Sequence, residues 1–276
     1  VFNTAIALGR LGAPSAFFSG VSTDMLGEIL ADTLTASQVD CRYLARSDRP
    51  TTVAFVKLVN GQATYAFYDE ETAGRMLSTD QLPVLGPEVS TLFLGGISLV
   101  NDPAASTYEA LQAREAASRV TMVDPNIRPG FIAGKEAAYR ARIERMIARA
   151  DLVKLSDEDL HWLEGPGDLG ALARGILARG PKAVFITEGA KGARALTATE
   201  DRFVAATPVT VADTVGAGDT FNAGVLAALH RAGALTKARV AALTAAELDA
   251  ALTLGTSAAA VTVSRAGANP PWAHEL

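Results

Sequence analysis

The sequence has a single cysteine, Cys41, among its 276 residues. One cysteine cannot form an internal disulfide, which excludes a small secreted scaffold held together by disulfide bonds. Lysines and arginines number 25 against 30 aspartates and glutamates, so the formal net charge is −5, and the basic residues form no long cluster. This balance argues against nucleic acid or an anionic membrane as a partner. The apolar runs, such as Leu92–Val100, are shorter than the ~18 residues that a membrane span needs.

The residues that are present suit a folded protein with a buried core. Hydrophobic residues make up 49% of the chain and charged residues 20%, so a disordered chain is excluded. The length allows one large domain or two small ones. These features favour a cytoplasmic protein. The chain opens at Val1 without an initiator methionine, so the residues leave open whether a targeting peptide precedes it.

Hydrophobic periodicity and turn residues predict strands and helices in alternation over most of the chain. Short strands joined by helices of this length are typical of a parallel sheet covered on both faces. We therefore predict an α/β fold: a doubly wound, mostly parallel sheet with helices on both faces. The predicted strands cover residues 91–94, 120–124, 152–155 and 183–187, and the predicted helices cover 24–36, 104–118, 137–148 and 169–179.

One segment departs from this alternation. Residues 43–68 have a β pattern throughout, with strands predicted at Thr51–Val59 and Gln62–Tyr68. Asn60-Gly61 between them favours a tight type I′ hairpin. We expect residues 43–76 to form a β-rich lid inserted into a single α/β domain made of residues 1–42 and 77–276.

A glycine-rich loop near the C-terminus carries the clearest chemical signal. The β-rich run that begins at Val209 leads into Gly216-Ala217-Gly218-Asp219, and a helix of small and apolar residues follows. Backbone N–H groups at a helix N-terminus lack partners and, together with the helix dipole, form an anion site. Because glycine and alanine are small, an anion can approach these amides closely.

Three interpretations of this loop compete. A dinucleotide-binding loop needs a third glycine where Phe221 stands, and a P-loop needs a Gly-Lys-Ser/Thr triplet that the chain lacks. Asp219 can be a simple helix N-cap beside a turn, since aspartate is a preferred cap. Alternatively, Asp219 accepts a proton from a hydroxyl while the neighbouring amides hold a transferring phosphoryl group, which is the chemistry of a kinase that acts on an alcohol.

The nine residues from Asp213 to Phe221 resemble the C-terminal signature of the ribokinase-like (PfkB) carbohydrate kinases. The resemblance extends over essentially the whole chain, because Asn3 with Gly12 is similar to part of the N-terminal signature of that family. It implies that Asp219 is the catalytic base and that Gly216, Ala217 and Gly218 form the anion hole. It also implies a lid that covers the sugar and mediates homodimer formation.

Four stretches, residues 48–52, 65–68, 72–75 and 123–129, look most like bacterial fructokinases within this family. The resemblance therefore implies ATP-dependent phosphorylation of a primary sugar hydroxyl, with fructose converted to fructose 6-phosphate. Ribose, 2-keto-3-deoxygluconate or a nucleoside are alternative acceptors, and a sensor that binds without turnover is an alternative of another class. The implied sugar-binding residues are Asn3, Phe67, Arg128 and Asp219.

ATP and Mg²⁺ are the cofactors that the resemblance implies, with K⁺ as a third candidate. Asp159 would bind Mg²⁺ through water, and Asp213 would lie beside the monovalent cation. Residues 187–192 resemble the strand and turn beside the nucleotide, and residues 265–270 resemble the loop near the adenine. The implied nucleotide-binding residues are Lys154, Ser156, Thr187, Gly189, Gly192, Gly216, Gly218 and Asn269.

The sequence departs from the family pattern at three places, one of which is Ser22, where the family usually has glycine. Ser156-x-x-Asp159 stands where the family usually has Asn-x-x-Glu, although aspartate still offers oxygen to a hydrated, hard cation. The first strand of the family and its Gly-Gly pair have no counterpart here. We therefore expect these residues to be a trimmed version of a slightly longer protein, with part of the sugar pocket outside them.

Overall fold

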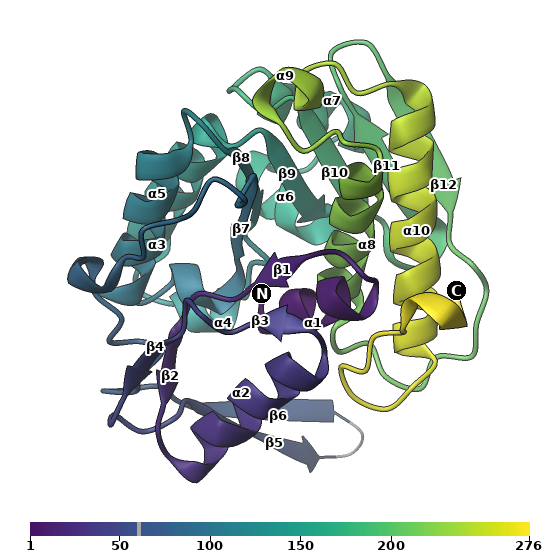
Figure 1. The fold of residues 1–276 in the computed structure, drawn as a ribbon. Coiled ribbons are helices and arrows are strands. Elements are labelled where there is room, and N and C mark those ends of the chain that lie inside the picture. Colours follow the sequence, from purple (N-terminus) through teal and green to yellow (C-terminus); the bar gives the residue numbers. More distant parts are fainter. Residues whose placement is uncertain (60–61) are drawn as a thin grey trace.

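A computed structural model describes the backbone of residues 1–59 and 62–276 and the side chains of residues 1–55 and 66–276. Its centre is a six-stranded sheet in the order β12-β11-β10-β9-β8-β7 (Figure 1). Strands β7 to β10 run parallel, whereas β11 and β12 are antiparallel to their neighbours. The strands are β7 (Thr91–Gly95), β8 (Val120–Asp124), β9 (Leu152–Ser156), β10 (Ala183–Thr187), β11 (Gly192–Leu196) and β12 (Asp201–Ala205).

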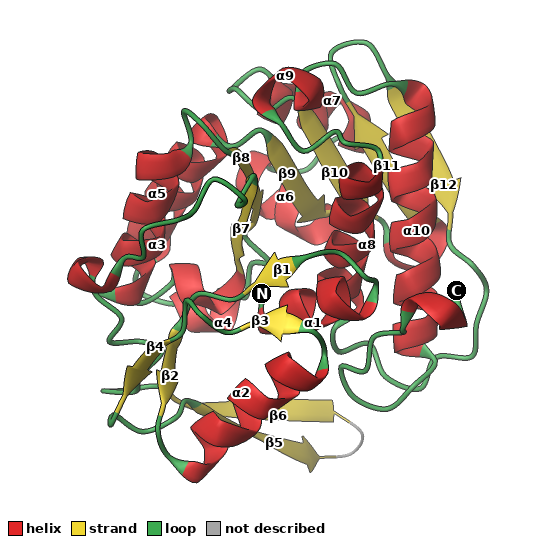
Figure 2. Cartoon of the chain, in the orientation of Figure 1, coloured by secondary structure: helices red, strands yellow, loops and turns green. Residues whose placement is uncertain are grey.

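Helices cover both faces of this sheet (Figure 2). Alternate residues of β10 face opposite ways: Val184 and Ile186 belong to one core cluster, and Ala183 and Phe185 to the other. All four are fully buried, which is typical of a sheet covered on two sides. The first cluster includes residues of α3 (Ala104–Glu115), α5 (Glu136–Arg149), α6 (Asp157–Glu164) and α7 (Leu169–Leu177), and the second those of α8 (Ala217–Arg231), α9 (Lys237–Val240) and α10 (Ala245–Val263). The predicted α/β class is confirmed.

The strand bounds were largely predictable, but the last part of the sheet was not. Strands β8 and β10 have the predicted bounds, whereas β11 and β12 were missed. β11 is Gly-Ala-Arg-Ala-Leu, a composition with low strand propensity. The β-rich interpretation of the run from Val209 was wrong: residues 206–216 form no strand, and the N–H groups of Ala212 and Asp213 both donate to the Val263 carbonyl of α10.

Among the described residues, three two-stranded sheets lie apart from the large sheet, on one side of the molecule (Figure 1). One is the antiparallel β5–β6 hairpin. The predicted Asn60-Gly61 turn lies outside the described residues. In the second sheet, residues 15–16 pair in parallel with residues 39–40, just before the predicted insert. In the third, residues 20–22 pair in parallel with residues 45–47, at the start of that insert. The elements of this part are α1 (Phe2–Arg10), β1 (Ser15–Ala16), β2 (Gly20–Ser22), α2 (Met25–Ala36), β3 (Val39–Asp40), β4 (Ala45–Ser47), β5 (Val53–Val59) and β6 (Gln62–Tyr68).

The carboxyl ends of the parallel strands meet at one edge of the large sheet. Gly95 of β7 is in register with Asp124 of β8, and Ser156 of β9 is in register with Thr187 of β10. The loops that leave these strands therefore lie side by side, which is where open α/β sheets bind ligands. In the described residues, no helix is long and apolar enough to cross a membrane.

Candidate active site

The residues of the predicted anion site lie at the N-terminus of α8. Gly216 caps this helix with φ of 82°, a left-handed conformation that favours glycine. A Cβ atom added at Gly216 would lie 2.9 Å from Cβ of Ala268. Both the backbone angle and the close neighbour therefore require glycine at this position.

The three amides of the predicted anion hole are not equivalent. The N–H of Ala217 donates to the Thr214 carbonyl over 3.3 Å. Within the described part of the chain, no acceptor is found for the N–H groups of Gly216, Gly218 and Asp219. The amides available to an anion are thus those of Gly216, Gly218 and Asp219, and the amide of Asp219 is one that the sequence did not suggest.

Helix α1 holds the carboxylate of Asp219. The Thr4 hydroxyl donates to Oδ1 over 2.9 Å, and Asn3 Nδ2 donates to Oδ2 over 2.9 Å. Asn3 is therefore brought to Asp219, as expected for two residues of one pocket. Thr4 was missed, because its buried hydroxyl gains a role only when α1 packs against α8.

These contacts set the ionisation of Asp219. Burial raises the pKa of its carboxyl group, and the hydrogen bonds from Asn3 and Thr4 lower it. Both hydrogen bonds favour the ionised form, which is the form that can accept a proton.

A buried charge pair lies directly behind the anion site. Lys154 and Asp124 are 3.3 Å apart, and their side chains are 4% and 5% exposed. A Cβ atom on Gly218 would lie 3.3 Å from Lys154 Nζ, so this ammonium group sits against the first turn of α8. Asn222 of the same helix donates to Asp124 over 2.7 Å. Burial raises the pKa of Asp124, and Lys154 opposes that shift.

Ser156 and Asp159 form a capping box at the start of α6. The carboxylate of Asp159 is 3% exposed and accepts the N–H groups of Ser156 over 3.1 Å and of Ile127 over 2.8 Å. The described residues contain no cluster of three or more histidine, cysteine, aspartate or glutamate side chains that could hold a metal. This donor set fits a Mg²⁺ ion that keeps its waters and phosphate ligands, and not one bound directly by several side chains.

The other residues expected to bind nucleotide or cation lie in two groups. Thr187 ends β10, and Gly189 and Gly192 take left-handed φ values of 56° and 135° in the turn that follows. The carboxylate of Asp213 accepts the N–H groups of Val215 and Gly267, each over 3.0 Å, which lowers its pKa. The loop 265–269 is therefore fixed to the approach of α8. Asn269 instead faces α1, where its Oδ1 accepts from Arg10 over 2.8 Å.

A cavity of about 1140 Å³ opens beside Asp219. The four residues that the sequence assigned to sugar binding, Asn3, Phe67, Arg128 and Asp219, all line it. Phe67 of β6 packs edge-on against Phe131 of α4 (Pro129–Ile132), with ring centroids 4.4 Å apart. The structure thus brings together residues from both ends of the chain and from the hairpin.

The arrangement is a carboxylate facing a cavity, with open helix amides next to it and a charged pair behind them. Comparison with known proteins places it in a family, because a profile of the pfkB family carbohydrate kinases matches residues 2–275. The chain belongs to this family.

This carbohydrate kinase is similar in sequence to a fructokinase of Rhizobium leguminosarum bv. trifolii. The two are 58% identical over 243 residues, which are 88% of this chain and 74% of that protein. Among solved structures, the fructokinase of Vibrio cholerae O395 with bound fructose, ADP and calcium ion has a TM-score of 0.83 and 28% identity, covering 97% of this chain and 85% of the other. A double mutant of that enzyme, with fructose, ADP and potassium ion, has a TM-score of 0.84 and 27% identity, covering 97% and 84%.

Proposed function

We propose that this kinase transfers the γ-phosphoryl group of ATP to the 6-hydroxyl of fructose. The single observation that carries the chemistry is the placement of Asp219, which lines the cavity and belongs to the same first turn of α8 as the open amides. A base and an anion site in the same helical turn suit a hydroxyl nucleophile and the phosphoryl group that it attacks. The choice of fructose is supported by the Rhizobium and Vibrio relatives.

In the proposed reaction, Asp219 accepts the proton of the hydroxyl as its oxygen bonds to the γ-phosphorus and the bond to the bridging oxygen of ADP breaks. Asn3 and Thr4 hold the carboxylate in place during this step. The N–H groups of Gly216, Gly218 and Asp219 stabilise the charge on the phosphoryl oxygens, and removing one such donor typically costs roughly 10²–10³ in kcat. Lys154 adds positive charge behind them.

The remaining nucleotide assignments follow from position. Ser156, Thr187, Gly189 and Gly192 lie on adjacent loops at the carboxyl edge of the sheet and would line the nucleotide, with Asn269 on the loop nearest α1. Asp159 would hold Mg²⁺ through water; when bound, this ion neutralises phosphate charge.

A potassium ion beside Asp213 is part of the proposal, supported by the potassium-bound Vibrio relative. Equal rates in potassium and in a bulky organic cation would contradict it.

We also propose that residues 43–76 act as a lid that excludes water from the sugar pocket, and that two copies associate through it in the cytoplasm. On the hairpin, Phe55 and Tyr68 are 60% and 63% exposed and contact each other edge-on. Exposed aromatic pairs of this kind suit an interface with a second copy. Light scattering that gives the monomer mass at micromolar concentration would contradict the dimer.

A panel of acceptors tests the substrate. With ATP and Mg²⁺, we expect kcat/KM for fructose to exceed that for ribose, 2-keto-3-deoxygluconate and nucleosides by at least about tenfold, the equivalent of about 1.4 kcal/mol in transition-state binding. ADP release in a coupled assay is the measurement. A preference for ribose or a nucleoside would overturn fructose as the substrate while leaving the kinase chemistry in place.

A further inference from the structure

The wall of the cavity formed by the base of the hairpin carries a charge pair that the reaction described above does not use. Asp69 follows β6 directly, and Arg75 lies six residues later. Arg75 Nη1 lies 3.1 Å from Asp69 Oδ1, and both side chains line the cavity while remaining 29% and 23% exposed. The pair is therefore accessible from the space in which the sugar would bind.

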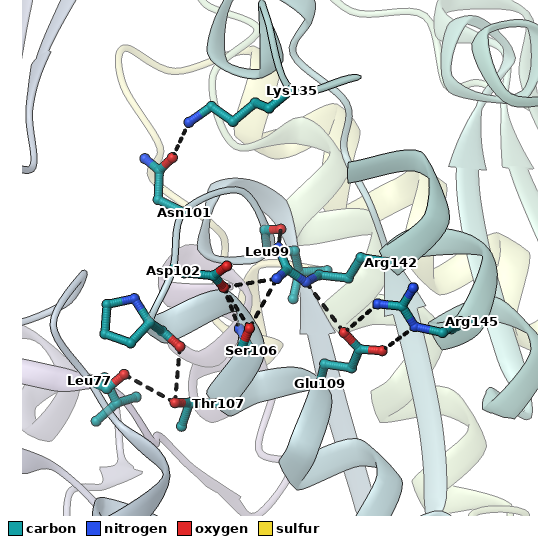
Figure 3. Close-up of polar contacts among 11 residues, drawn as sticks. Leu77, Leu99, Asn101, Asp102, Ser106, Thr107, Glu109, Lys135, Arg142 and Arg145 are labelled. Carbon is teal, nitrogen blue, oxygen red and sulfur yellow. Dashed lines mark hydrogen bonds and ion pairs between the residues drawn. The ribbon is translucent and has the colours of Figure 1, made fainter. Parts of the chain in front are cut away.

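The surrounding contacts fix this pair in one orientation. Asn101 Nδ2 donates to Asp69 Oδ2 over 2.7 Å, so both carboxylate oxygens have partners. Lys135 donates to Oδ1 of Asn101 (Figure 3), which leaves the amide nitrogen of Asn101 as the donor to Asp69. The backbone of Arg75 is held too, because its carbonyl accepts the N–H of Ala104 over 3.1 Å.

Ion pairs join the start of α3 to α5, the two helices that support Asn101. Arg142 of α5 pairs with Asp102 over 2.8 Å, and Arg145 pairs with Glu109 of α3 over 2.7 Å (Figure 3). These contacts hold the start of α3 against α5. Asn101 thus stands on a rigid support, a condition for precise positioning of a binding group.

The guanidinium group of Arg75 has hydrogen-bonding capacity to spare. A guanidinium carries five N–H donors, and in the described part of the chain Asp69 is its one side-chain partner. The positive charge is matched by Asp69, so the pair offers directional donors with little net charge. Such a group suits the hydroxyl oxygens of a neutral sugar better than the carboxylate of a sugar acid.

We propose that Arg75 is a sugar-binding residue that donates to hydroxyl oxygens other than the one that Asp219 deprotonates, and that Asp69 and Asn101 are its positioning residues. The pair also determines specificity, because Asp69 cancels the charge that would otherwise attract a sugar acid. This proposal rests on the proposed sugar-kinase function. It names the residues that bind the sugar hydroxyl groups that do not react.

The test compares Arg75→Met with Arg49→Met in the full chain. Arg49 pairs with Glu71 over 2.7 Å near the same turn but does not line the cavity, so the two variants remove the same group from neighbouring ion pairs. We expect Arg75→Met to raise KM for fructose about tenfold or more, from the loss of charged hydrogen bonds, with KM for ATP unchanged. Arg49→Met should leave both KM values within about twofold of wild type.

Equal fructose KM values for the two variants would overturn the proposal. If Arg75→Met does not fold, Arg75→Lys decides by the same criterion, because lysine keeps the charge but loses the fork of donors. If the wild type prefers another neutral sugar, the comparison is run with that sugar, so the failure of the fructose assignment is distinguished from the failure of Arg75.

Asp69→Asn tests the specificity half of the proposal. This change leaves the charge of Arg75 unmatched. We therefore expect the ratio of kcat/KM for 2-keto-3-deoxygluconate to that for fructose to rise about fivefold or more, which is less than the effect of a fully buried charged contact. An unchanged ratio would contradict a role for Asp69 in excluding acidic sugars.

Discussion

Replacing Asp219 by asparagine is expected to lower kcat by about 10²- to 10⁴-fold, the range that a positioned general base contributes. Asparagine preserves the size of the side chain but cannot accept the proton of the sugar hydroxyl. The binding of ATP and sugar should change little, since the amides of α8 and the walls of the cavity remain. The measurement is sugar-dependent ADP release, with sugar affinity followed separately by calorimetry.

Asp168→Asn is the matched control, because Asp168 caps α7 and asparagine is an equally good cap. Its activity should equal that of the wild type. Release of ADP by Asp219→Asn within about threefold of wild type, far inside the general-base range, would contradict the role of Asp219.

Lys154→Met is expected to lower the free energy of unfolding by about 3–5 kcal/mol, the typical cost of breaking a buried ion pair by removing one partner. The cause is Asp124, whose side chain is 5% exposed and would lose the ammonium group 3.3 Å away. Denaturant unfolding measures the change. A loss below about 1 kcal/mol would show that the pair is not buried as described.

The double variant Asp124→Asn with Lys154→Met separates stability from catalysis. It removes both charges, so part of the lost stability should return relative to Lys154→Met alone. If Lys154 also acts on the transferring phosphoryl group, the double variant should stay deficient in kcat/KM for ATP even where it is folded. Full recovery of both stability and activity would restrict Lys154 to a structural role.

The order of residues along the chain was enough to predict the α/β class and the bounds of β8 and β10, and it singled out the loop from Asp213 to Phe221 as the proposed site of chemistry. These features are local, because each depends on residues that are close together in the sequence. Strand and helix periods are examples, and so are the small residues that let a helix N-terminus approach an anion. The same reasoning failed for β11, whose alanines and glycine carry little strand signal and which is a strand because it pairs with β10 and β12.

Which side chains meet was settled by tertiary packing. Asn3 and Asp219 are 216 positions apart, and Asp124 and Asn222 are 98 positions apart. The order of strands and the packing of α1 on α8 create these contacts. For this reason, neither the hydrogen bond from Thr4 to Asp219 nor the Asp69–Arg75 ion pair on the cavity wall was predicted from the residues alone. The sequence supplied the chemical groups, and the packing of distant segments placed the carboxylate of Asp219 against α1 and the cavity.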